Sequence, residues 1–227
     1  MGLSYFVTGS INQCSVESGL SNEAKVLLSK ASQTDVSQAP AADMFELGSK
    51  VQVLKYGTLF APRANKLAEL YRQCQSLEDI PADEVKNLEE KIFRKPLAQI
   101  WSETQSFFAS KDPDTLEKAL ANPKLKMALV FRWYLGQASR WAISGLSDRR
   151  TDWCVFCGPS LGAFNEWVTG TDYEDPNNRK VADLACLLLH GAAVTKRISL
   201  ARDLGLLPDD FFVSPGPLPP EELANFF

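Results

Sequence analysis

The sequence lacks an excess of positive charge. Its 227 residues contain 24 Lys and Arg against 28 Asp and Glu, which gives a formal net charge of −4. A protein that binds nucleic acid or an anionic membrane through its overall electrostatics needs the opposite balance. We therefore expect neither nucleic acid nor a membrane among its partners.

The sequence also lacks a secretory signal and a disulfide framework. Met1 leads into Gly-Leu-Ser-Tyr-Phe, with neither a basic start nor a long apolar stretch behind it. The five cysteines are odd in number and widely spaced. Such usage is typical of a reducing compartment, so a cytoplasmic protein is predicted.

What the sequence does contain is a long apolar segment that the rest of the chain can pack around. A helix is predicted to begin at Pro123, after the capping residue Asn122, and to end at Gly145. Beyond its first turns the only charges are Arg132 and Arg140. A helix that is apolar on nearly all sides is covered by several neighbours, so we expect a central buried helix.

The remaining elements give a mainly α fold. Short strands are expected at Leu3 to Thr8 and Lys50 to Leu54, and a loop over residues 32–43. Further helices are expected from the start signals at Ser21, Pro62, Pro81, Pro96, Asp112-Pro113, Pro159 and Asp175-Pro176.

Three regions follow from this pattern. Residues 1–57 hold the strands and a connecting segment, residues 58–206 form a helical domain, and residues 207–227 are proline-rich. The last region is expected to be an extended or disordered tail.

One stretch matches a hydrolase motif. Gly158-Pro-Ser-Leu-Gly162 has the G-x-S-x-G spacing of a nucleophile elbow, and an aspartate and His190 follow Ser160 in the chain. An elbow needs several strands before it, whereas residues 61–145 supply helices. A buried neutral histidine also explains His190. A serine hydrolase or acyltransferase acting through Ser160 is therefore only the third hypothesis.

The cysteines offer a metal site as an alternative to plain packing. Cys154 and Cys157 form a C-x-x-C pair, and Cys186 and His190 lie four residues apart, on one face of a helix. Their neighbours are apolar and aromatic, which favours buried thiols that pack as small apolar groups. We predict no metal site.

The loop that follows the first expected strand could contact an anion. A strand that ends in Thr8-Gly9-Ser10 lets backbone N–H groups approach a phosphate, because glycine has no Cβ to obstruct them. On spacing alone a simple turn explains the same residues.

Segments along most of the chain carry a family resemblance. They are Thr8–Gln13, Ala39–Glu46, Lys50–Lys55, Gly57–Phe60, Arg63–Leu67, Ile92–Lys95, Lys126–Leu135, Ser139–Trp141 and Cys157–Trp167. They look like the C-terminal part of PfaD-type proteins, the trans-acting FMN-dependent enoyl reductases of polyunsaturated fatty-acid and polyketide synthases, related to nitronate monooxygenases. The similarity runs from Gly2 to about Arg202.

The resemblance implies an oxidoreductase fragment. Its fold would be a multi-helix subdomain behind the last strand of an incomplete flavin-binding (β/α)8 barrel. Thr8, Gly9 and Ser10 would form one wall of an FMN phosphate site. The rest of the barrel, with the site for NAD(P)H as reductant, would lie in a missing N-terminal segment. No catalytic position can be carried over to these residues.

Two functions are therefore weighed against each other. In the first, the chain is the C-terminal portion of an enoyl reductase that acts on intermediates bound to an acyl carrier protein or megasynthase. In the second, it is a non-catalytic helical module that docks an acyl carrier protein or a synthase. The Thr8-Gly9-Ser10 loop favours the first, because a docking module has no need of it.

Overall fold

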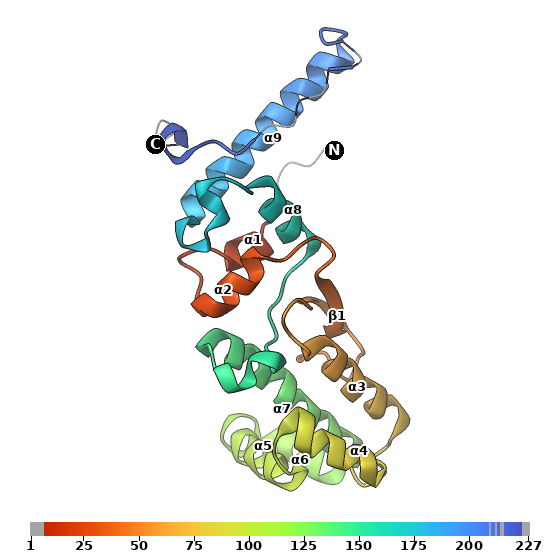
Figure 1. Cartoon of the computed structure of the whole chain (residues 1–227). Helices are drawn as coiled ribbons and strands as arrows, with labels where there is room; N and C mark the ends of the chain where they lie inside the picture. The colour runs from red at the N-terminus through yellow and green to blue at the C-terminus, as the bar shows by residue number, and fades with distance from the viewer. Residues whose placement is uncertain (1–6, 209, 212, 214–215, 224–227) are drawn as a thin grey trace. The chain divides into compact units, whose positions relative to one another are not determined.

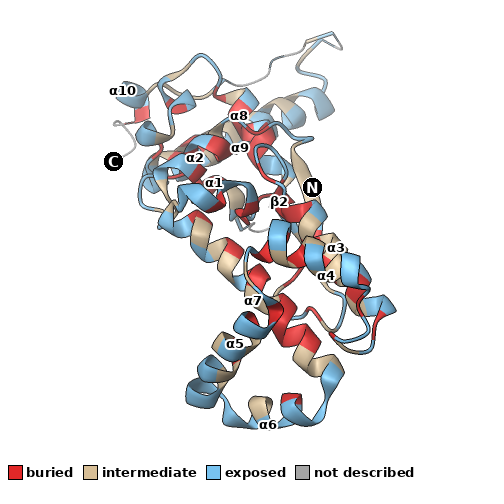
Figure 2. Ribbon diagram, turned by 60° about the horizontal axis from the view of Figure 1, so that its bottom comes forward, coloured by how far each residue is buried: buried red, intermediate tan, exposed pale blue. Residues whose placement is uncertain are grey.

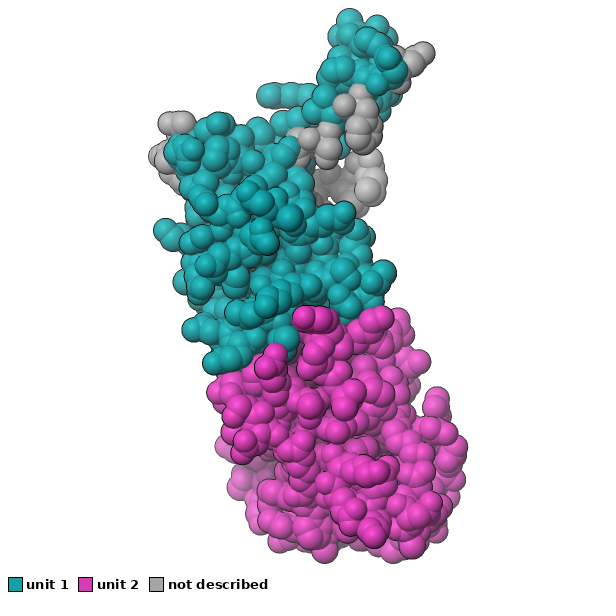
Figure 3. Space-filling view, viewed as in Figure 1, with its two compact units in different colours: residues 1–35, 157–227 teal, residues 36–156 magenta. Residues whose placement is uncertain are grey.

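The computed structural model describes residues 7–208, 210, 211, 213 and 216–223. The chain forms two compact units, one of residues 36–156 and one of residues 1–35 together with 157–227 (Figure 3). Helices dominate both units (Figure 1), so the mainly α prediction is confirmed. The predicted three-part division stays a prediction, and the compact units divide the chain at different residues.

The described residues form one small sheet. Strand β1 (Val36–Pro40) runs antiparallel to β2 (Lys50–Leu54), with Val36 opposite Leu54. The prediction for β2 is confirmed, but the expected loop over residues 32–43 is wrong. Pairing with β2 and the burial of Ala39 outweigh the weak strand preference of the Val-Ser-Gln-Ala-Pro segment.

The barrel-strand prediction finds no support in the described residues. Most of the expected strand, Leu3 to Phe6, lies outside them, and Val7 and Thr8 belong to neither a strand nor a helix. The one sheet that is described has two strands and lies in the other unit. The fold is therefore mainly α, and the barrel fragment remains unconfirmed.

The helices of residues 36–156 begin close to their predicted start signals. They are α3 (Phe60–Gln73), α4 (Ala82–Asn87) with a π-helical turn (Leu88–Phe93), α5 (Leu97–Lys111), α6 (Pro113–Ala121), α7 (Pro123–Ser144) and a 3-10 turn (Ser147–Asp152). The caps explain the agreement. The Asp112 carboxylate accepts a hydrogen bond from the Thr115 N–H, and the Asn122 side chain accepts bonds from two N–H groups of α7.

Helix α7 is the centre of this unit, as predicted. Its core positions, including Phe131 and Tyr134, are fully buried, and Figure 2 shows buried residues along α7. The Phe131 ring lies near those of Phe45 and Phe93, with centroids 6.2 and 6.3 Å away. The helix ends at Gly145, whose φ of 65° is the left-handed conformation that glycine adopts readily.

The second unit is built around a smaller core. Its elements are α1 (Ser10–Gln13), α2 (Asn22–Ser29), α8 (Pro159–Trp167), two 3-10 turns (Asp172–Glu174 and Pro176–Asn178), α9 (Val181–Asp203) and α10 (Pro220–Leu223). The helix expected from Pro176 therefore begins only at Val181. Leu184 and Leu187 of α9 pack with Phe164 of α8, and Leu223 of α10 joins them.

Helix α9 is long, apolar and largely exposed. Within the described chain it is the one helix of a length and composition that could cross a membrane. Leu184 and Leu187 are buried in it, whereas Leu189 and Leu200 are exposed. The predictions of a cytoplasmic location and of no membrane partner stay predictions.

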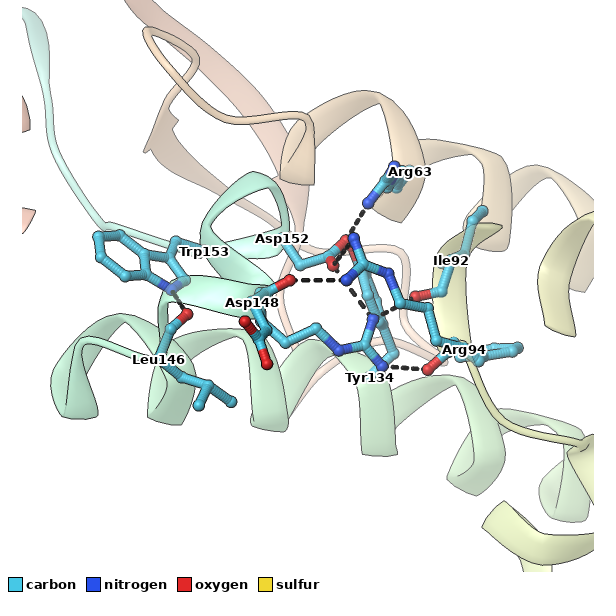
Figure 4. A network of polar contacts seen from close by, with 10 residues as sticks. Arg63, Ile92, Arg94, Tyr134, Leu146, Asp148, Asp152 and Trp153 are labelled. Atoms are coloured by element: carbon cyan, nitrogen blue, oxygen red, sulfur yellow. Dashed lines mark hydrogen bonds and ion pairs between the residues drawn. The ribbon is translucent and has the colours of Figure 1, made fainter. Parts of the chain in front are cut away.

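A buried carboxylate ties the elements around α7 together (Figure 4). Asp152 is fully buried, and its side chain accepts hydrogen bonds from Arg63 of α3, from Tyr134 of α7 at 2.9 Å and from Arg149 at 3.1 Å. Arg94 lies 3.8 Å from the same carboxylate. A buried charge is costly unless it is paired in this way.

The partners of Asp152 are themselves fixed. Arg149 also donates to the carbonyl oxygens of Ile92 and Phe93, and its guanidinium lies 4.3 Å from the centre of the Trp141 ring. Burial lowers the pKa of Arg149, and burial together with the Asp152 charge raises the pKa of Tyr134. The network thus joins α3, α7 and the end of the π-helical turn.

We expect Asp152→Asn to destabilise the protein strongly. The substitution keeps the shape of the side chain but leaves three arginines without their counter-charge, and breaking a buried pair costs about 3 kcal/mol or more. Urea unfolding of the purified chain measures the loss. Asp148→Asn, at an exposed position four residues earlier, is the matched control and should stay within about 0.5 kcal/mol of the parent. Equal stability of both variants would show that the network does not support the fold.

Candidate functional site

The predicted anion loop lies at the start of α1. Thr8 accepts two hydrogen bonds from the Asn12 side chain, at 3.1 Å to its carbonyl oxygen and 3.2 Å to its hydroxyl oxygen. The Ser10 hydroxyl accepts a bond of 2.8 Å from the Gly158 N–H. Gly9 has an ordinary φ of −107°, and a Cβ at this position would contact nothing within 4 Å. These polar groups therefore stabilise the loop and its contact with residue 158.

The residues around Ser160 resemble an elbow only in part. Ser160 is exposed in the first turn of α8. Before it, Phe156 makes one isolated bridge to Val53 rather than a strand of a larger sheet. His190 lies on α9 beside Gly191, which faces the Trp167 ring at the far end of α8. Ser160 and Trp167 are about two helical turns, roughly 10 Å, apart along the helix axis.

Gly162 has a clear packing role. It is buried, and a Cβ there would overlap the backbone of Ser32 and Gln33. One turn further along α8, the Asn165 side chain donates hydrogen bonds of 2.8 Å to the carbonyl oxygens of Leu28 and Ala31. The second glycine of the motif therefore lets α8 approach the end of α2 closely.

The cysteines lie in apolar surroundings. Cys154 and Cys157 are buried and Cys186 is half-buried. Burial raises the pKa of Cys157 to about 11, which keeps this thiol protonated and unreactive at neutral pH. Over the described part of the chain, no three His, Cys, Asp or Glu side chains group in a way that could hold a metal ion.

A buried arginine that no sequence pattern singled out organises the smaller core. Arg179 is fully buried and donates to the Tyr173 carbonyl oxygen at 2.7 Å, to the Asn165 side-chain oxygen at 2.9 Å and to Cys14 Sγ at 3.3 Å. Burial lowers its pKa. Its partners come from distant segments, so only the folded structure reveals the cluster.

A groove of about 420 Å³ lies between α5 and α7. This volume falls within the range of about 300 to 1,000 Å³ that is usual for small-molecule sites. Its apolar walls come from Phe107 and Phe108 of α5 and from Leu129 and Trp133 of α7. Gly136 opens the same face of α7 one turn beyond Trp133.

Charged side chains surround the groove, and two of the four that line it are neutralised by neighbours. Arg132 of α7 pairs with Glu46 at 3.0 Å, and Glu103 of α5 pairs with Lys95 at 2.7 Å. The other two lining charges, Arg140 and Asp43, have no ion pair among the described residues. The groove is thus apolar along its walls, with an accessible cation on α7.

The sequence analysis did not predict this groove, although one residue of α7 is unusual for a buried helix. Gly136 interrupts an otherwise apolar helix, and a glycine inside a helix is destabilising relative to alanine. Phe107 and Phe108 follow each other on α5, and Phe107 is half exposed. The groove depends on how α5 lies against α7, which periodicity alone does not define.

Comparison with known proteins relates the chain to acyl-transfer and synthase proteins. Residues 74–153 match the family model described as acyl-carrier-protein S-malonyltransferase, inserted helical domain. The chain is 44% identical over 209 residues to a polyunsaturated fatty acid synthase protein of Thraustochytrium sp., covering 89% of this chain and 14% of that protein. It is 45% identical over 194 residues to polyketide biosynthesis protein PksE of Bacillus subtilis, covering 86% of this chain and 25% of that protein.

One solved structure is also similar. The enoyl reductase domain of MlnA, from the macrolactin biosynthesis cluster of Bacillus amyloliquefaciens, superposes with a TM-score of 0.81 at 42% identity. The match covers 91% of this chain and 45% of that domain. The chain thus spans a quarter or less of the two curated relatives and under half of the solved domain. The activity in that structure's name belongs to the larger domain.

These comparisons correct the family prediction. The matching family model is the inserted helical domain of a malonyltransferase, which points to an acyl-transfer type of domain and not to a PfaD-type enoyl reductase. The assignment as an FMN-dependent oxidoreductase is therefore wrong, and with it the expectation of FMN and NAD(P)H as cofactors. The expected link to fatty-acid and polyketide synthesis is supported.

We expect Gly162→Ala to destabilise the chain by about 2 kcal/mol, because the added methyl group must displace the backbone at residues 32–33. Thermal unfolding of the variant measures this loss. Gly136→Ala is the matched control, since a Cβ there meets nothing within 4 Å. This control should raise stability by about 0.5 to 1 kcal/mol. A neutral effect of Gly162→Ala would contradict the packing role.

Proposed function

We propose that the chain is a helical module of a polyunsaturated fatty-acid or polyketide synthase, and that it docks an acyl carrier protein. Two findings support the proposal. Residues 74–153 match an inserted helical domain of a carrier-protein malonyltransferase, and the named relatives are synthase and polyketide biosynthesis proteins. This is the docking alternative rather than the hypothesis that the Thr8-Gly9-Ser10 loop favoured.

The charge of α7 is the observation that carries the proposal. The helix holds four cations and no carboxylate, in a chain whose net charge is −4. Those cations are Lys124, Lys126, Arg132 and Arg140. Lys126 and Arg132 are paired with Glu78 and Glu46, and Lys124 donates to the carbonyl oxygens of Tyr71 and Cys74. Exposed Arg140 is therefore the α7 cation with no ion pair among the described residues, and such a cation can steer and orient an acidic partner. An acidic face of a carrier protein is the partner of stated chemistry that this helix fits.

The position of α7 within the matched region strengthens the assignment. The region from residue 74 to residue 153 contains α4, α5, α6 and α7. The walls of the groove on α5 and α7 lie inside it as well. The part of the chain that resembles the malonyltransferase insert therefore also carries the basic helix.

Titration calorimetry with an acyl carrier protein from a synthase of this type tests the docking role. We expect saturable binding that weakens as salt is added, because exposed charges are screened over about 8 Å at physiological ionic strength. Arg140→Glu should weaken binding about tenfold, a change of roughly 1.4 kcal/mol. Lys196→Glu on α9, another exposed cation, changes the net charge equally and should have little effect. No saturable binding, or equal losses in both variants, contradicts the proposal.

A second function is acyl transfer through Ser160. The family model that matches residues 74–153 is named for a malonyltransferase, and Ser160, which lies outside that match, is exposed at the start of α8. These two observations favour it. The Ser160 oxygen would attack the carbonyl carbon of a malonyl thioester. An ester then forms, the C–S bond breaks, and the serine proton passes to the leaving thiolate.

Mass spectrometry after incubation with malonyl-CoA tests this second function. We expect a malonyl ester on Ser160 that disappears in Ser160→Ala and persists in Ser147→Ala, which removes another exposed serine. An unmodified chain, or modification that is equal in all three proteins, rules out Ser160 as the nucleophile.

A further inference from the structure

The glycine at position 136 leaves space that the packing of the protein does not use. Gly136 lies well inside the 22-residue helix α7, where glycine costs about 0.5 to 1 kcal/mol relative to alanine. A Cβ there would meet nothing within 4 Å. No neighbouring side chain or backbone segment requires the glycine, and its effect is to keep the groove beside it open.

The groove follows one face of α7. Leu129, Trp133, Gly136 and Arg140 are spaced by three or four residues, which places them on one side of the helix. At 1.5 Å per residue they extend over about 16 Å. The series runs from apolar side chains at one end, across the open position, to a guanidinium at the other.

Helix α5 supplies the opposite wall. Phe107 and Phe108 line the groove, and their rings lie edge to face with centroids 5.2 Å apart. Phe107 remains half exposed. Thr104 also lines the groove, but its hydroxyl is already engaged with the Ile100 carbonyl oxygen at 2.8 Å. This wall therefore presents mainly apolar surface over that stretch.

The charged residues that line the groove determine which chemical group of a ligand can lie near Arg140. Arg132 and Glu103 are neutralised by Glu46 and Lys95, so Arg140 and Asp43 remain as the lining charges that can act on a guest. A guanidinium donates hydrogen bonds and cannot accept them. The end of the guest near Arg140 must therefore accept hydrogen bonds, and Asp43 weakens the attraction of a negative group.

We propose that the groove binds a single hydrocarbon chain that ends in a carboxylate or a thioester carbonyl. The chain lies along Leu129, Trp133 and Phe107 and passes over Gly136, and its polar end accepts from Arg140. The inference extends the proposed function. Binding of the hydrocarbon itself does not depend on that function, whereas its delivery by a carrier protein does. A carrier protein docked on α7 would present such an acyl chain to the groove.

Fluorescence titration of the full chain with bromine-labelled dodecanoate tests the site. Bromine quenches a tryptophan that it contacts, and Trp133 lines the groove. We expect saturable quenching in the parent. Gly136→Leu places a larger side chain in the groove, beyond a Cβ that would meet nothing within 4 Å, and should weaken binding at least about tenfold. No quenching in the parent, or equal quenching in Gly136→Leu, overturns the proposal.

Substitutions of Arg140 and Asp43 give a second test, because they should change the affinity for dodecanoate in opposite directions. Arg140→Gln should weaken dodecanoate binding about tenfold because a charge-assisted hydrogen bond is lost. Asp43→Asn should strengthen it by removing a nearby like charge. Dodecanol carries no charge but can still accept a hydrogen bond, so Arg140→Gln should weaken its binding less than that of dodecanoate, and Asp43→Asn should leave it unchanged. Equal effects on both probes would contradict the placement of the polar end.

A third binding experiment tests whether a carrier delivers the hydrocarbon ligand. Dodecanoyl-phosphopantetheine binding that Gly136→Leu abolishes supports delivery of the chain by a carrier. Binding of dodecanoate without binding of the thioester overturns that source and leaves a free carboxylate as the ligand. These probes are small molecules, so their failure is distinguishable from a failure of carrier-protein docking in calorimetry.

Discussion

The Asp152 carboxylate is fully buried, and Arg63, Tyr134 and Arg149 share it. A charge withdrawn from water in this way is stable only while all of its partners remain in place. Those partners come from α3, from α7 and from the turn at residues 147–152. The free energy cost of an unpaired carboxylate therefore holds these elements in one arrangement, and apolar packing around Phe131 fills the space between them.

Because Tyr134 faces Asp152, the rotation of α7 about its own axis is set, and with it the side chains that its other faces present. Leu129 and Trp133 are directed along the groove with α5, and Arg140 lies at its end. Arg149 stacks on Trp141 and bonds to the end of the π-helical turn. One helix thus combines a buried polar anchor with an accessible basic and apolar face. The proposed docking of an acidic carrier protein and the proposed binding of a hydrocarbon chain both use that face.

The sequence predicted local structure far better than the site. Pro123, Asn122 and Gly145 defined α7 because caps act within a few residues, whereas β1 was missed because its stability comes from pairing with β2. The Asp152 network and the groove join residues far apart in the chain, so no local pattern reveals them. The PfaD-type resemblance was wrong because residues 74–153 match the inserted helical domain of a malonyltransferase, and the inferred flavin chemistry was wrong with it.

Hydrogen–deuterium exchange of the chain with and without an acyl carrier protein tests the central claim most directly. The claim is that the face made by α5 and α7 is the docking surface. Amide exchange should slow in residues 97–111 and 123–144 when the carrier is bound, while residues 157–203 remain unchanged. Slower exchange confined to residues 157–203, or no change at all at saturating carrier, would contradict the account.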